Sequence, residues 1–227
     1  MFTVIEYAPL LGRGALVTIS VAVLSLVLAT GLGVLGAAAK LSKRGLWRSV
    51  GMGYTTIVRG IPDLVLILLI YFGGQRLVND IGSTLGFDYI EVSKFWAGVI
   101  SIGFIYGAYL SETFRGAYLT VPRGQAEAAQ ALGMKTIATL WKVLVPQILR
   151  FALPGYSNVW MVLVKSTAVV SVIGLSDLVG LADKAGKSTR QQFWFYLAVL
   201  LAYLFITIIS EHLLKRLDKR VNRGIPA

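Results

Sequence analysis

The chain has 227 residues, of which 56% are hydrophobic and only 15% are charged, whereas a soluble domain carries roughly 25% charged residues. The charges gather in short blocks between long apolar runs, which indicates a membrane protein with several spans and disfavours a soluble domain. The formal net charge of +11 does not indicate nucleic-acid binding, since no nucleic-acid-binding motif is present. The sequence has no cysteine and a single histidine, His212, which excludes disulfides and metal clusters held by histidine or thiolate ligands.

Five apolar runs are candidate membrane-spanning helices, each near the roughly 20 residues that a span needs. They are Ala15–Ala39, Ile57–Val78, Phe95–Gly116, Phe151–Ser176 and Phe193–Ser210, the last extended to residue 213. The first run has 25 uncharged residues, too many for the apolar core of a signal peptide, about 7–15. We therefore expect it to remain as a span, although Ala37-Ala38-Ala39 could mimic a cleavage site. The sequence predicts one membrane domain, residues 10–214, and a basic tail, residues 215–227.

The distribution of lysine and arginine predicts the orientation, because cytoplasmic loops are enriched in both. With the N-terminus outside, the inside set is Lys40, Lys43, Arg44, Arg48, Arg59, Arg115, Arg123, Lys135, Lys142, Arg150, Lys215, Arg216, Lys219, Arg220 and Arg223. The outside set is Arg13, Arg76, Lys94, Lys184, Lys187 and Arg190, and Lys165 stays within the membrane. This asymmetry predicts an N-terminus outside and a C-terminus inside. The loops Leu77–Lys94 and Asp177–Gln192 then face outside, and neither is long enough for a domain of its own.

The segment 122–146 is a polar insert between apolar runs, on the predicted inner side. Pro122 suits the first turn of a helix, and Gly133 is expected to end that helix in a left-handed cap. A second short helix, Thr136–Val145, should then lead to Pro146. Small residues at Ala128 and Ala129 would let the first helix sit deep in a groove of a partner, and Glu127 would offer a charge. An ordinary amphipathic connector on the membrane surface is the alternative.

The same insert carries a resemblance to a known family. It reads EAAQALGMKTIATLWKVLVP from Glu127 to Pro146, and its Glu-Ala-Ala, Gly, Pro spacing is similar to the signature loop of permease subunits of ATP-binding-cassette importers. Val143 and Val145 stand where that pattern usually has Ile and Leu. Further segments resemble the polar amino-acid branch of these permeases, namely Tyr54–Leu69, Gly103–Gly116, Leu163–Leu175 and Ala185–Thr189. From about Leu10 to Leu214 the chain is most similar to the Q-type subunit of the histidine/lysine/arginine/ornithine permease.

This resemblance implies an all-α membrane protein with five transmembrane helices and a cytoplasmic coupling helix, the type I importer permease fold. It implies a non-catalytic subunit that forms half of a pathway for a polar, basic amino acid in a bacterial inner membrane. Implied partners are two copies of an ATPase, a second permease subunit (M-type, or a copy of this chain), a periplasmic amino-acid-binding protein and membrane lipid, but no nucleic acid. ATP and Mg²⁺ would be used by the ATPase alone. The coupling residues would be Glu127, Ala128, Ala129, Gly133 and Pro146.

Charges inside the predicted spans are the candidate pathway or gate residues, because intramembrane charge usually faces a cavity or a partner. Glu112 and Arg115 lie one turn apart, as do Arg59 and Asp63, and the two pairs could form one ion network that closes an inner mouth. They could equally hold two helices in register. Glu112 could contact a cationic substrate.

Lys165, which Ser166 and Thr167 follow, lies deeper in its span. It could pair with Glu112 or Asp63, or it could mark a local helix break that lines the pathway. Gly103, Gly107 and Ser111 recur every four residues, which favours close helix packing, either within this chain or against a partner subunit.

One apparent motif fails, and two rival functions remain open. Gly186-Lys187-Ser188 resembles the end of a phosphate-binding loop, but the preceding Gly180 is one residue too far away, so an ATPase must be a separate chain. A self-sufficient secondary transporter is disfavoured because the sequence has only five spans and no internal repeat. A non-transporting membrane scaffold is disfavoured because charges lie within the spans.

Overall fold

The computed structural model describes residues 2–221, so the end of the predicted basic tail, residues 222–227, lies outside the described residues. Every regular element in the described range is helical, which confirms the predicted all-α class. The elements are α1 (Phe2–Glu6), α2 (Ala8–Leu41), α3 (Gly45–Gly60), α4 (Asp63–Thr84), α5 (Lys94–Thr120), α6 (Arg123–Ala131), α7 (Thr136–Thr139), the π-helical η1 (Leu140–Leu144), α8 (Val145–Ser166), the 3₁₀-helical η2 (Thr167–Ile173), α9 (Leu178–Thr189) and α10 (Gln192–Val221).

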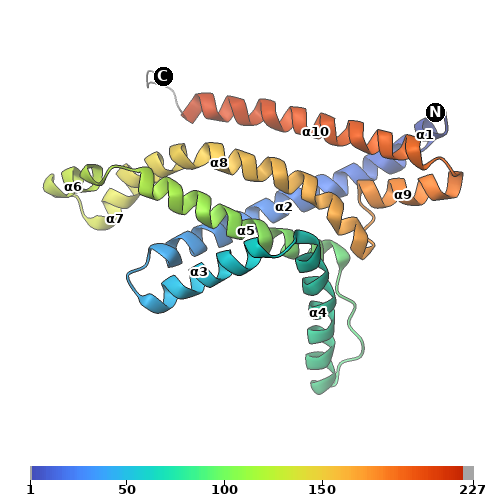
Figure 1. Cartoon of the computed structure of the whole chain (residues 1–227), viewed down its shortest axis with the longest axis horizontal. Helices are drawn as coiled ribbons and strands as arrows, with labels where there is room; N and C mark the ends of the chain where they lie inside the picture. Colours follow the sequence, from blue (N-terminus) through green and yellow to red (C-terminus); the bar gives the residue numbers. More distant parts are fainter. Residues whose placement is uncertain (1, 222–227) are drawn as a thin grey trace.

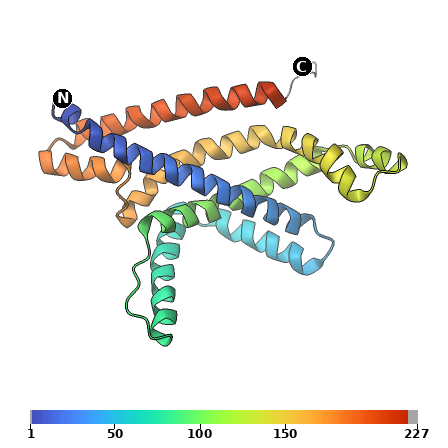
Figure 2. The same cartoon turned by 180° about the vertical axis from the view of Figure 1, so that it is seen from behind.

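The long helices α2, α5, α8 and α10 run lengthwise through the molecule, and α3 lies along α2 and α5 (Figure 1). Helix α4 turns away from this bundle and projects from it, with the following loop returning beside it (Figure 2). The α2–α3 turn, the α6–α7 segment and the C-terminal end of α10 lie toward one end of the bundle, whereas the N-terminus and α9 lie toward the other. The segments that their lysines and arginines assign to the inner side of the membrane thus lie together at one end of the bundle.

Four helical stretches are long and apolar enough to cross a membrane: Ala8–Leu41, Asp63–Thr84, Thr136–Ile173 and Gln192–Val221. The predicted count of five is therefore not confirmed. The predicted third span, Phe95–Gly116, does form a helix within α5, but glycine, serine and tyrosine dilute its hydropathy.

The predicted second span, Ile57–Val78, is wrong as a single helix. Helix α3 ends at Gly60, and α4 begins only at Asp63. Pro62 has no N–H to donate and forces the preceding residue out of the helical region, and Ile61 is indeed extended (φ −112°, ψ 140°). Because α4 continues to Thr84, the connection to α5 is shorter than the predicted loop Leu77–Lys94.

The predicted bounds of the fourth span, Phe151–Ser176, are wrong at both ends, because the observed helical stretch begins before Phe151 and ends before Ser176. Helical structure runs from Thr136 to Ile173, and Gly174 ends it with φ +82°. The predicted separate helix Thr136–Val145 is therefore the first part of this longer helical stretch. Pro146 cannot donate a backbone hydrogen bond, and a turn of π-helix, Leu140–Leu144, directly precedes it.

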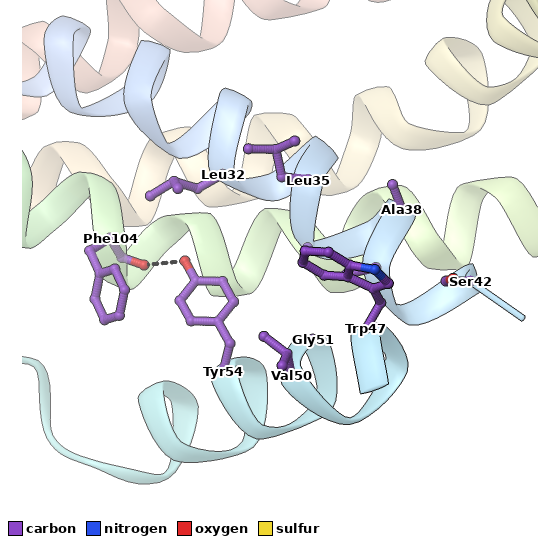
Figure 3. A pocket seen from close by; sticks show the side chains of 11 residues that line it. Leu32, Leu35, Ala38, Ser42, Trp47, Val50, Gly51, Tyr54 and Phe104 are labelled. Carbon is purple, nitrogen blue, oxygen red and sulfur yellow. Dashed lines mark hydrogen bonds between the residues drawn. The ribbon is translucent and has the colours of Figure 1, made fainter. Parts of the chain in front are cut away.

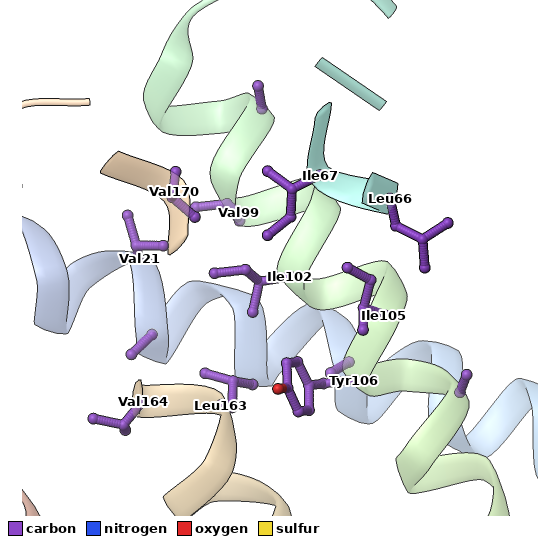
Figure 4. Packing of buried hydrophobic residues seen from close by; sticks show 14 of the residues in the cluster. Val21, Leu66, Ile67, Val99, Ile102, Ile105, Tyr106, Leu163, Val164 and Val170 are labelled. Carbon is purple, nitrogen blue, oxygen red and sulfur yellow. The ribbon is translucent and has the colours of Figure 1, made fainter. Parts of the chain in front are cut away.

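The close contact of α2 with α5 forms the centre of the core. Ile102, Ile105 and Tyr106 of α5 are buried, and around them pack Val21 of α2, Leu163 of α8, Val170 of η2 and Leu66 and Ile67 of α4 (Figure 4). Small residues allow the two backbones to approach. A methyl group added to Gly33 of α2 would lie 2.6 Å from Cβ of Leu110, and one added to Gly103 of α5 would lie 2.6 Å from Leu28. The predicted packing role of Gly103 and Gly107 is thus confirmed, and the helix they face belongs to this chain.

The predicted outer loop Asp177–Gln192 contains a helix, α9, that the sequence analysis missed. Asp177 caps it by accepting a hydrogen bond from the amide of Gly180 at 2.9 Å, and burial raises the pKa of the Asp177 carboxyl above its usual range. Thr18 of α2 accepts a hydrogen bond from the amide of Leu178 at 3.1 Å. These two contacts fix α9 against the end of α2.

Gly33→Ala should destabilise the protein by about 1–3 kcal/mol, because the new methyl group would overlap the Cβ of Leu110. Gly31→Ala, two residues earlier on α2, meets no atom within 4 Å and should be neutral or stabilising by up to about 1 kcal/mol through helix propensity. Unfolding midpoints of the two variants in detergent test this, and equal midpoints would contradict the α2–α5 packing.

Candidate functional site

Glu112 of α5 is the centre of an ion cluster that joins three helices. The Lys40 ammonium of α2 contacts its Oε1, Arg115 Nε lies 3.0 Å from its Oε2, and Arg59 Nη1 of α3 lies 3.9 Å from its Oε1. Lys40 also donates a hydrogen bond to the Thr55 hydroxyl of α3 at 2.7 Å. The Lys40 side chain is 11% exposed and that of Glu112 is 23% exposed, so both charges are largely removed from solvent. One carboxylate thus holds three cations.

A cleft of about 380 Å³ opens beside this cluster. It is lined by Lys40, Thr55, Thr56, Arg59, Gly60, Tyr109 and Glu112. The Arg59 guanidinium lies 5.3 Å from the centre of the Tyr109 ring, a distance suited to a cation–π contact. Glu112, Arg115 and Arg59 thus belong to one ion network, whereas its predicted role, closing an inner mouth or holding helices in register, stays a prediction.

Asp63 does not join that network, although it stands one turn from Arg59 in sequence. The break at Ile61 and Pro62 separates the two residues onto different helices. The carboxylate of Asp63 accepts a hydrogen bond from the Tyr106 hydroxyl at 3.0 Å, and that hydroxyl lies 2.5 Å from the Ser166 hydroxyl. A second polar cluster thus lies in the middle of the bundle, formed by Asp63, Tyr106 and Ser166.

The residues after Lys165 do not show the predicted local break. Helix α8 ends at Ser166 and continues directly into the 3₁₀-helical η2 at Thr167, so the helix tightens after the lysine without interruption. The Lys165 side chain is exposed, and none of the ion pairs among residues 2–221 involves it. The predicted pairing with Glu112 or Asp63 is therefore wrong, because Lys40 occupies Glu112 and Tyr106 occupies Asp63. Thr167 is buried, and its hydroxyl lies 3.1 Å from that of Tyr203.

The predicted coupling residues Glu127, Ala128 and Ala129 lie on α6, at one end of the bundle (Figure 1), and Gly133 follows that helix, whereas Pro146 lies in the first turn of α8. Pro122 is the N-cap of α6, one position before the predicted first turn. Gly133 has φ +83°, which confirms the predicted left-handed cap. Glu127, Ala128 and Pro146 are exposed, whereas Ala129 is buried.

Sequence reasoning missed three residues of these sites. Lys40 was assigned to the cytoplasmic margin, and its place beside Glu112 depends on how α2 packs on α5. Tyr106 had no sequence signal beyond its polarity within an apolar run, and Thr55 lies two residues before the predicted second span. No group of acidic, histidine or cysteine side chains within residues 2–221 is arranged to hold a metal ion.

Comparison with known proteins decides the family. Residues 29–223 match the family model described as binding-protein-dependent transport system inner membrane component. The chain belongs to this family.

Individual relatives support the same assignment. The histidine/lysine/arginine/ornithine transport system permease protein HisQ of Salmonella typhimurium is 45% identical over 213 residues, which cover 94% of this chain and 93% of HisQ. The arginine ABC transporter permease protein ArtQ of Escherichia coli K12 is 36% identical over 234 residues, covering 96% of this chain and 97% of ArtQ. A chain of a crystal structure titled as an amino acid ABC transporter with histidines superposes with a TM-score of 0.83 at 30% identity, covering 96% and 97% of the two chains.

These findings confirm the predicted membership of the importer permeases, and the structural match confirms the predicted permease fold apart from the number of spans. The chain is a multi-pass component of a bacterial inner-membrane transport system.

A double-mutant cycle should detect the Lys40–Glu112 contact. With Lys40→Met and Glu112→Gln, we expect a coupling free energy of about 1–2 kcal/mol, because both side chains are largely withdrawn from solvent. The exposed pair Glu211–Lys215 on α10 serves as control and should show a clearly smaller coupling. Unfolding free energies of the four variants of each pair give the result, and equal couplings would contradict a special role for the Glu112 cluster.

Proposed function

We propose that this chain is the permease subunit of an ATP-driven importer of a polar, basic amino acid and that it supplies half of the translocation pathway. The observation that carries the proposal is its likeness along nearly its whole length to HisQ and ArtQ, whose names specify histidine, lysine, arginine and ornithine transport. The second half of the pathway would come from a related permease subunit or from a second copy of this chain. A periplasmic binding protein would deliver the amino acid.

The polar groups of the bundle suit a cationic substrate. Asp63 and Glu112 supply carboxylates, and Tyr106, Ser166 and Thr167 supply hydroxyls near the middle of the bundle. A carboxylate that must attract a passing cation has to be released from its own partners. The Glu112 cluster therefore acts as an inner gate in this proposal, with Arg59 and Arg115 as its movable cations and Lys165, beside the change from α- to 3₁₀-helix, as a pathway residue.

Helix α6 would receive the force that opens this gate. It follows α5 after only Val121 and Pro122, and Glu112 lies two turns before the end of α5. Leu132 is 85% exposed and Trp141 is 66% exposed, so α6 and η1 present apolar side chains beside the charge of Glu127. Such a mixed surface suits docking on a partner protein. That partner would be the ATPase, in two copies, which alone would bind ATP and Mg²⁺.

The orientation follows from the basic residues. With α6 inside, the N-terminus would be periplasmic and the C-terminus cytoplasmic, as the excess of lysine and arginine at that end favours. Cytoplasmic closure of the ATPases would then displace α6, α5 and Glu112 together. The pathway would alternate between inward- and outward-facing states.

Glu127→Lys should leave membrane insertion intact and lower ATP-dependent uptake by about tenfold or more, because a charge reversal at a docking surface replaces attraction with repulsion. Uptake by the assembled importer in proteoliposomes, with ATP inside, measures this. Glu6→Lys makes the same charge change at the opposite end of the bundle and should transport normally. Normal uptake by Glu127→Lys would end the coupling assignment, and uptake without ATP would indicate a secondary transporter instead.

Glu112→Gln should reduce uptake of cationic amino acids about tenfold more than uptake of neutral ones, because it removes the charge that attracts the cation. Arg115→Gln perturbs the same cluster but keeps the carboxylate, so it should lower both substrate classes alike. Competition uptake with lysine and glutamine tests the pair of variants. An equal loss of both substrates in Glu112→Gln would remove Glu112 as a reader of substrate charge.

A further inference from the structure

A cleft without charged lining residues lies apart from the Glu112 cluster. It has a volume of about 600 Å³ and is formed between α2, α3 and α5. Its lining is Leu32, Leu35, Gly36, Ala38, Ala39, Ser42, Trp47, Val50, Gly51, Tyr54 and Phe104, so no charged residue contributes (Figure 3). The Tyr54 hydroxyl donates a hydrogen bond to the carbonyl of Phe104 at 2.6 Å and needs no further partner. The walls of the cleft, which we call the α2–α3 groove, therefore suit an apolar occupant.

The dimensions of the α2–α3 groove match one leaflet of a membrane. Along α2 its lining extends from Leu32 to the residue just after the helix, Ser42, which corresponds to about 15 Å of helix rise. Half of the roughly 30 Å hydrocarbon core of a bilayer is the same length. Leu35, Trp47 and Val50 are each more than half exposed, so the groove is open along its side.

One end of the groove adjoins a strongly basic turn. Figure 3 places Ser42 and Trp47 at this end, opposite Leu32 and Phe104. The turn between α2 and α3 carries Lys43 and Arg44, and Arg48 follows Trp47 on α3. All three cations are exposed, and none of the ion pairs among residues 2–221 involves any of them.

We propose that the α2–α3 groove binds an anionic phospholipid. One acyl chain lies along the apolar walls between α2 and α3, and the phosphate headgroup lies against Lys43, Arg44 and Arg48. Basic clusters beside membrane spans attract anionic lipids, and a tryptophan at the mouth suits the headgroup level. A second apolar cleft of about 400 Å³, between α2, α8 and α10, has no charged residue in its lining and should not distinguish lipids by charge.

A helix of a second permease subunit is the competing occupant of the groove. The charge at its mouth favours the lipid, since three cations without an acidic neighbour to pair with would repel a matching basic turn of a related chain. The lipid site does not depend on the proposed substrate or on ATP coupling. A negative result for lipid binding would therefore leave the transport proposal unchanged.

Native mass spectrometry of the purified permease complex, titrated with phosphatidylglycerol and with phosphatidylcholine of the same acyl chains, tests the site. We expect phosphatidylglycerol to bind on the order of 100-fold more tightly, from about fivefold per cation. The triple variant Lys43→Gln, Arg44→Gln, Arg48→Gln should lose this preference. The control Arg216→Gln, Lys219→Gln, Arg220→Gln removes the same charge from the end of α10 and should keep it.

A separate substitution tests the apolar walls of the groove. Ala38→Phe places a ring in the groove and should abolish the tight binding of phosphatidylglycerol, whereas Val34→Phe, on an exposed face of α2 outside the groove, should bind it like the parent protein. Equal binding of the two lipids by the parent protein, or equal losses in the two triple variants, would overturn the proposal. So would an Ala38→Phe variant that keeps its lipid but loses its permease partner, because the groove would then be a subunit contact.

Discussion

The close packing of α2 on α5 is the constraint on which the rest of the structure depends. Small residues at Gly33, Gly36 and Gly107 bring the two helices together, and a side chain at any of them would overlap the neighbouring helix. This approach sets Lys40 beside Glu112, and it places Thr55 of α3 within reach of the same lysine. Helices α3, α8 and η2 then pack around this pair, so the ion cluster and the core have one common support.

Helix α5 links the three functional features of the chain. Tyr106 lies in its middle, Glu112 lies one and a half turns later, and α6 follows at its end after two residues. In the proposed mechanism, a movement of α6 would reach the ion cluster through about 12 Å of continuous helix, from Glu112 to Thr120. The break at Ile61 and Pro62 gives α4 a separate direction, so α3 and its Arg59 can respond with α5 while α4 keeps its own contacts.

The sequence predicted those features that depend on local chemistry. The apolar runs located α2, α5 and α10, and Gly133 marked the end of α6, because a left-handed cap favours glycine. It failed where tertiary packing decides. A pairing of Lys165 with Glu112 was one of its two interpretations, but Lys40 of α2 pairs with Glu112 instead. The predicted second span includes Pro62, although its ring divides α3 from α4. The predicted outer loop contains α9, a helix of 12 residues that is too short to register as a span.

The account stands on α6 as the element that meets an ATPase, and the absence of native cysteine makes a direct measurement possible. A single cysteine at Gln130 on the exposed surface of α6 can be treated with a short bifunctional cross-linker in membranes that contain the assembled importer. A matched cysteine at Ser83, exposed near the end of α4, reports on a part of the chain remote from α6. The account predicts that Gln130→Cys cross-links to the ATPase and that Ser83→Cys does not. Cross-linking of the ATPase from Ser83→Cys alone would contradict it.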